Sequence, residues 1–262
     1  MNQPLKTLLP SFALTVCMIC SLNFCAAPAD AQGASARFDS KPTSEFHFAR
    51  LVYSNAPYSR RGRGGASWAV DYPEAEYHLM DGIERMTIID VELVDYDGVG
   101  GRLISLDNDT IFDYPWLYAV EVGQWYLSTD EAKRLREYLD RGGFLVVDDF
   151  WGPNEWQVFV ASMKKVFPDR LIVEIDEADP VMSTVFKVDK STQIPGRRGV
   201  RPGNIPYWRG IYDDQGRLQV AINFNMDMGD AWEHASDPGY PAAMTAMAYR
   251  FAVNYIVYSM TH

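Results

Sequence analysis

Short apolar runs alternate along the chain with longer segments in which apolar residues recur at helical spacing. Strands are expected from the runs at residues 46–54, 87–94, 116–122, 144–147, 170–175 and 218–224. Helices are expected from the spacing at residues 71–86, 128–143, 153–167, 179–186 and 241–260. Residues 190–216 carry neither pattern and are predicted to be irregular. The alternation predicts an α/β fold, a three-layer sandwich in which helices cover both faces of a mostly parallel, doubly wound sheet.

The helix predicted at residues 128–143 has the clearest ends. Ser128 and Glu131 have the spacing of a capping box, in which each side chain accepts a hydrogen bond from a backbone N–H that the helix leaves unpaired. Gly142 is a natural left-handed stop. At the start of the first predicted helix, Asp71 is expected to act as the cap.

Two acidic stretches follow predicted strands. Asp148 and Asp149 come directly after a short, unbroken apolar run, where the strand is expected to end. The carboxyl ends of parallel strands lie at one edge of a sheet, and ligands bind there. We therefore expect segments 148–155 and 227–234 to lie side by side. The expected pocket is lined by Asp71, Asp148, Asp149, Glu155, Asp227, Asp230, Trp232 and His234.

The same acids suggest a metal site, although no cofactor is firmly implied. Asp149, Asp227 and Asp230 are the candidate ligands, and their oxygen atoms suit calcium or magnesium. The alternative is structural. One acid of the first stretch then caps the following helix, and residues 223–234 form a loop held by Asn and Asp turns.

Two basic loops interrupt the acidic sequence. The first carries Arg60 and Arg61 among glycines, between the first predicted strand and helix, where α/β folds bind anions. The second loop adds Arg197, Arg198, Arg201 and Arg209. Together the loops predict either a local anion site or solvated, structureless turns.

The N-terminal segment is typical of a secretory signal peptide at residues 1–31, cleaved after Ala31. Residues 32–45 then form a linker and residues 46–262 a single domain. An exported, periplasmic or secreted protein is expected, with an uncleaved N-terminal anchor as the alternative. All three cysteines, Cys17, Cys20 and Cys25, lie in the signal peptide, so the mature chain lacks a thiol nucleophile.

Charge and hydropathy limit the partners. A net charge of −11 argues against general nucleic-acid binding, which depends on neutralising phosphates. Residues 241–260 are apolar almost all round, but Arg250 and Asn254 near the middle favour a buried packing helix over a membrane span. We therefore expect no transmembrane span in the mature chain.

Several stretches together resemble a bacterial family, the domain of unknown function DUF4159. They include FHFARLVYS, WAVDYPEAEYHL, DDFWGPNEW and NMDMGDAWE, and they cover residues 46–260. Residues 117–149 are also similar to a strand–helix–strand unit of class I glutamine amidotransferases. The resemblance implies a flavodoxin-like or glutamine-amidotransferase-like sheet and a role alongside envelope partners. The related enzymes use a cysteine at a sharp turn, and this chain has no such elbow, so thiol-dependent amidotransferase activity is not expected.

The sequence contains no recognisable nucleophile or catalytic motif. We therefore expect a non-catalytic binding or assembly module of the cell envelope, with a glycan, an anion or an envelope protein as its ligand. The alternative is a metal-assisted hydrolase that acts on a glycan or peptide. In that case Asp149 and Asp227 would hold the metal, and His234 or Glu155 would be the base.

Overall fold

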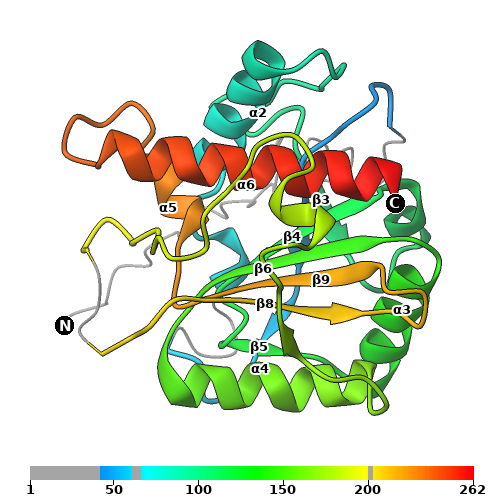
Figure 1. The fold of residues 1–262 in the computed structure, drawn as a ribbon. Coiled ribbons are helices and arrows are strands. Elements are labelled where there is room, and N and C mark those ends of the chain that lie inside the picture. Colours follow the sequence, from blue (N-terminus) through cyan, green and yellow to red (C-terminus); the bar gives the residue numbers. More distant parts are fainter. Residues whose placement is uncertain (1–41, 61–65, 200–202) are drawn as a thin grey trace, which may run out of the picture.

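The computed structural model describes residues 42–60, 66–199 and 203–262 (Figure 1). A seven-stranded sheet has the order β3-β1-β4-β6-β9-β8-β7. Neighbours from β3 to β9 are parallel, and β8 and β7 join antiparallel, so the sheet is mostly parallel as predicted. The strands are β1 (Ala49–Val52), β3 (Arg102–Ser105), β4 (Trp116–Val120), β6 (Phe144–Phe150), β7 (Val173–Glu174), β8 (Tyr207–Tyr212) and β9 (Leu218–Phe224). A separate two-stranded sheet pairs β2 (Ser54–Asn55) with β5 (Trp125–Tyr126).

Helices cover both faces of the large sheet, which confirms the predicted α/β sandwich (Figure 1). Alternate residues of one strand enter two different cores, as the pleat requires. In β4, Trp116 and Tyr118 pack in one core, while Leu117 and Ala119 pack in the other. The first core is covered by α2 (Glu74–Met86), α5 (Met228–Glu233) and α6 (Ala242–Thr261). The second is covered by α3 (Thr129–Asp140) and α4 (Gly152–Val166).

The best-predicted helix is α3. The Ser128 hydroxyl accepts from Glu131 N at 3.2 Å, and the Glu131 carboxylate accepts from Ser128 N at 2.7 Å, so the capping box is present. Gly142 follows the helix with a φ of +107°, a conformation that glycine adopts without steric cost. The interpretation of this segment from sequence is confirmed.

The strand β6 differs from the prediction because it does not end before the acids. It continues through Asp148 and Asp149 to Phe150. Against β9 the register moves from Val147 opposite Ile222 to Phe150 opposite Phe224, so β6 contains one extra residue, a β-bulge. Asp149 lies in this bulge with a φ of +48°. The bulge lets the strand stay paired while Asp149 leaves the pleat.

Several other helices and strands predicted from the sequence were wrong. Residues 87–94 form no strand, and within them Ile88 is fully exposed because β3 takes the place beside β1. The predicted irregular region at 190–216 contains β8, whose pairing with β9 the sequence pattern did not reveal. The expected helix at 179–186 is a single 3₁₀ turn, η3 (Pro180–Met182). The other short 3₁₀ turns are η1 (Ser67–Ala69) and η2 (Asp109–Asp113).

The final helix α6 packs across one face of the sheet, as predicted (Figure 1). Its central Asn254 is fully buried and braces the segment before it. The Asn254 amide accepts from the N–H groups of Val185 and Phe186 and donates to the carbonyls of Val181 and Phe186. Across the described parts of the chain, every helix is too short or too polar to cross a membrane. The predicted signal peptide at 1–31 lies outside the described residues, as does most of the predicted linker.

Candidate functional site

The two acidic segments lie side by side at the carboxyl edge of the sheet, where β6 and β9 end. Asp149 N donates to the carbonyl of Met226 at 3.1 Å. One oxygen of Asp148, Oδ2, accepts from the N–H groups of Met228 and Gly229 at 2.6 and 3.2 Å. The sheet therefore brings segments 148–155 and 227–234 together.

Asp148 holds the short helix α5 and does not line the pocket described below. Its side chain is fully buried, and it also accepts from the Tyr118 hydroxyl at 2.9 Å. Burial raises the pKa of Asp148 to about 7, and the hydrogen bonds from Tyr118, Met228 and Gly229 oppose that rise. The prediction that Asp148 is a ligand-contacting residue is thus replaced by a structural role at the start of α5.

Two further candidates, Trp232 and Glu155, do not line the pocket. Trp232 is fully buried, and its ring packs 5.4 Å from Tyr118 and 6.5 Å from Phe48, centroid to centroid. Glu155 accepts from Trp151 N at 2.7 Å and from the Gln124 amide at 3.0 Å. The Glu155 contacts stabilise the start of α4, and Glu155 also pairs with Arg60 at the rim of the pocket. Trp232 belongs to the core.

A pocket of about 560 Å³ opens between these segments. We call it the carboxylate pocket because acids from four parts of the chain line it. They come after β4, from the bulge in β6, from the segment after β9, and from the segment before α2. The lining acids are Asp71, Glu121, Asp149, Asp227, Asp230 and Glu233.

Three of these carboxylates come close enough to share one ion. Asp71, Asp227 and Asp230 each present an oxygen, and these oxygens all lie within 4.8 Å of one another. The sequence prediction named Asp149 in place of Asp71. Asp149 lines the same pocket, but its Oδ1 accepts from the indole N–H of Trp151 at 2.6 Å, and it stands outside the trio.

Asp71 reaches the trio because a buried arginine fixes the turn before it. Arg50 in β1 is fully buried, pairs with Glu76 in α2, and donates to the carbonyls of Trp68 and Val70 at 3.0 and 2.9 Å. The backbone then passes through Asp71 with a φ of +62°, which Asp tolerates better than most residues. The side chain does not cap α2, as the sequence had suggested, because this turn directs it to the pocket.

The pocket concentrates negative charge in a buried setting. Burial, followed by the neighbouring charges of Asp149 and Asp230, raises the pKa of Asp71 well above its usual value. Burial, followed by the charges of Asp149 and Asp71, does the same to the pKa of Asp227. The buried Oδ2 of Asp71 has no hydrogen-bond donor among the described residues. Protons or a cation are therefore needed to offset this charge.

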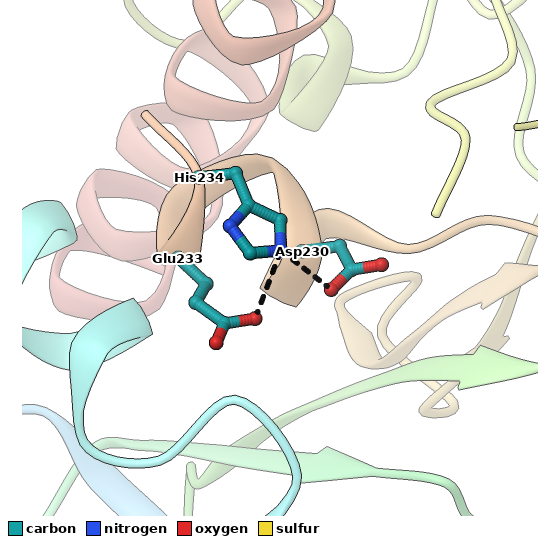
Figure 2. A group of neighbouring side chains, drawn as sticks. All are labelled: Asp230, Glu233 and His234. Carbon is teal, nitrogen blue, oxygen red and sulfur yellow. Dashed lines mark ion pairs between the residues drawn. The ribbon is translucent and has the colours of Figure 1, made fainter. Parts of the chain in front are cut away.

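A second group of side chains shares Asp230 with the trio (Figure 2). His234 Nε2 lies 3.3 Å from Glu233 Oε2 and 3.7 Å from Asp230 Oδ1. Burial raises the pKa of Glu233; His234 opposes this and Asp230 adds to it. All three residues belong to α5 or its C-cap, whereas the trio combines α5 and its N-cap Asp227 with Asp71 from the turn before α2.

Arginines lie on the rim of the carboxylate pocket. Arg60 is about half exposed and pairs with Glu121 and Glu155 at 3.4 and 3.1 Å. Arg197 donates its backbone N–H to Asp230 Oδ2, which fastens the second basic loop over the acids. Arg61, the other candidate in the first basic loop, lies outside the described residues.

Sequence reasoning missed Glu121 and Glu233 as lining residues. Glu121 directly follows the buried strand β4, which ends at Val120. The sequence analysis extended this strand to residue 122, so Glu121 was placed within the strand and not at its end. Glu233 stands beside predicted His234, but only the helical turn of α5 shows that it faces the same side.

Comparison with known families assigns most of the chain to a family. The family model of the domain of unknown function DUF4159 matches residues 47–260, which is most of the chain. No curated protein matches the sequence.

Proposed function

The chain belongs to the DUF4159 family, and we propose that this member is an exported binding or assembly module of the cell envelope that holds its ligand through a divalent cation. Calcium or magnesium suits the site, and a glycan or an envelope protein is the ligand. The observation that carries the proposal is the trio of Asp71, Asp227 and Asp230, with one buried Asp71 oxygen left without a donor.

The chemistry of the trio favours a hard cation. Calcium and magnesium take carboxylate oxygens, whereas softer metals prefer nitrogen and sulfur ligands. Asp227 is only 5% exposed, its Oδ1 accepts from Asp230 N at 2.8 Å, and one of its carboxylate oxygens lies within 4.8 Å of an oxygen of each of the other two acids. A bound cation replaces three mutually repelling charges with three favourable contacts.

The proposal is tested by titrating the purified, EDTA-treated protein with calcium, magnesium, manganese and zinc by calorimetry. We expect calcium or magnesium to bind once per chain and to raise the melting temperature. Asp227→Asn is expected to weaken that binding about tenfold or more. The matched control is Asp214→Asn, because Asp214 is exposed in the β8–β9 turn and lies outside the pocket. Failure of all four metals to bind would remove the proposal.

A second candidate function is a metal-assisted hydrolase acting on a glycan or peptide. The observation that favours it is His234, which lies between two carboxylates and beside the trio (Figure 2). In this proposal the trio holds the metal, and His234 acts as the base toward a water molecule. Metal-loaded protein would release reducing sugar or free amine from envelope material, and His234→Gln would abolish the release while keeping metal binding.

A further inference from the structure

A second pocket, of about 310 Å³, lies at the same edge of the sheet on the α4 side. It shares no lining residue with the carboxylate pocket. We call it the Arg209 pocket, because Arg209 in β8 lies among three aromatic rings there. The Arg209 guanidinium carbon lies 4.0, 4.5 and 6.0 Å from the ring centroids of Tyr207, Trp156 and Phe224.

Arg209 differs from the other arginines that stack on rings. Within the described chain the Arg209 side chain forms neither a hydrogen bond nor an ion pair. Among the residues that the structure describes, five other arginines stack on rings, and each of the five also pairs with a carboxylate. These pairs are Arg50–Glu76, Arg134–Asp109, Arg136–Asp169, Arg141–Glu137 and Arg170–Asp140.

The protein fixes Arg209 in place. Its backbone is paired on both sides, opposite Ile222 of β9 and Glu174 of β7. Stacked rings cover the flat face of a guanidinium and leave its in-plane N–H groups at the edge. Those N–H groups match the two oxygens of a carboxylate, which they can bind in parallel.

The pocket walls are also held in place. The Asn225 side chain accepts from Gly152 N at 2.8 Å and donates to the carbonyl of Ile205 at 2.7 Å, so it ties the start of α4 to the facing loop. The side-chain amide of Asn204 lines the pocket and bonds to no described residue. A free amide of this kind suits a ligand hydroxyl group.

We propose that the Arg209 pocket binds an acidic sugar, with the carboxylate on Arg209, a hydroxyl group on Asn204 and the ring against the Trp156 and Tyr207 side chains. Aromatic rings contact the apolar faces of sugars well, and a hydroxyl-bearing ring uses the Asn204 amide, which an acidic peptide side chain does not need. This site is separate from the proposed cation function and needs no metal.

The test uses galacturonate as the probe, titrated by NMR into purified protein in EDTA. Galactose, which lacks the carboxylate, and N-acetylglutamate, which lacks the sugar ring, are the matched ligands. We expect galacturonate to bind in the millimolar range and the other two about tenfold more weakly. The proposal would be overturned if galactose or N-acetylglutamate bound as tightly as galacturonate, or if galacturonate showed no saturable binding.

The variants separate recognition from packing. Arg209→Lys keeps the positive charge but loses the paired N–H groups of the guanidinium and its stacking on the aromatic rings. Galacturonate binding is therefore expected to fall about tenfold. Asn204→Ala, which removes no core contact, is expected to weaken galacturonate but leave N-acetylglutamate unchanged. Arg141→Lys is the control, because Arg141 also stacks on a ring, Phe112, but already has a carboxylate partner. Asp227→Asn is expected to leave galacturonate binding unchanged, so this result is independent of the cation proposal.

Discussion

The buried Oδ2 of Asp71 lies against Gly229, so close that a methyl group at this glycine would come within 2.2 Å of it. Gly229 is the second residue of α5, and Asp71 comes from the turn before α2. Two segments far apart in sequence therefore meet with no room for a side chain between them. The glycine is what allows Asp71 to enter the carboxylate pocket.

Gly229→Ala should accordingly weaken cation binding. Alanine normally stabilises a helix by about 1 kcal/mol relative to glycine, but here the added methyl displaces Asp71. We expect the cation affinity, measured by calorimetry, to fall about tenfold. In an Asp71→Ala background the clash with the carboxylate is gone, and only the Tyr118 hydroxyl, 3.0 Å from the added methyl group, remains close. There Gly229→Ala should cause no further loss of cation affinity. A similar loss of affinity in both backgrounds would contradict this explanation.

The cation-free protein should become less stable as the pH rises above about 4, the ordinary carboxyl value. Burial and neighbouring acids raise the pKa values of Asp71, Asp149 and Asp227, so the folded state holds protons that the unfolded state releases. The stabilisation from these protonated carboxyl groups is complete when the pH is below their pKa in the unfolded state. It is lost as the pH rises through their pKa in the folded state. The pKa of about 7 for Asp148 places part of this loss near neutrality.

The measurement is the melting temperature between pH 4 and pH 8 in EDTA, compared with Asp227→Asn. Burial lowers the pKa of His47, which acts in the opposite sense below about pH 6.5, and the comparison with the variant cancels that effect. We expect a smaller fall in the variant and a reversal of the fall when calcium is added. An identical pH profile for the two proteins would count against the acidic cluster as its cause.

Glu76→Gln should destabilise the whole domain. Arg50 and Glu76 are 0% and 1% exposed, so the substitution leaves a buried guanidinium without its counter-charge. The expected loss is about 3–5 kcal/mol in the free energy of unfolding, measured with urea. Glu84→Gln, an exposed position on the same helix, is the control and should change little. Because Arg50 also holds the turn before Asp71, the cation affinity of Glu76→Gln should fall as well.

Asn254→Leu should destabilise the protein without changing the carboxylate pocket. The substitution leaves the N–H groups of Val185 and Phe186 without an acceptor beneath α6. The expected cost is about 3 kcal/mol, again from urea unfolding. Cation affinity at a temperature where the variant is folded should match the unsubstituted protein, and a large drop would show that the two regions are coupled.

Elements that are determined by neighbouring residues could be predicted from the sequence. The capping box of α3 and the start of β6 at its apolar run depend only on neighbouring residues, and both were predicted correctly; the end of β6 was not. The strands β3 and β8 were missed because their pairing depends on distant partners. Gly210 in β8 shows this, since a side chain there would collide with Leu218 of the next strand.

The candidate site was predicted at the level of segments and not of single contacts. The meeting of segments 148–155 and 227–234 follows from parallel strand direction, which the alternation of strands and helices reveals. The direction of each side chain does not follow from it. Asp148 turns into the protein toward α5, and Asp71 replaces Asp149 in the trio, because a bulge and a turn with positive φ set those directions.

The bulge in β6 has a consequence for comparing related chains. One inserted residue lets two consecutive aspartates serve different purposes, one bonded to α5 and the other at the pocket wall. A relative that kept both acids but lacked the insertion would send the second carboxylate toward the opposite layer. Homologues are therefore better matched by the length of this segment than by their aspartate count.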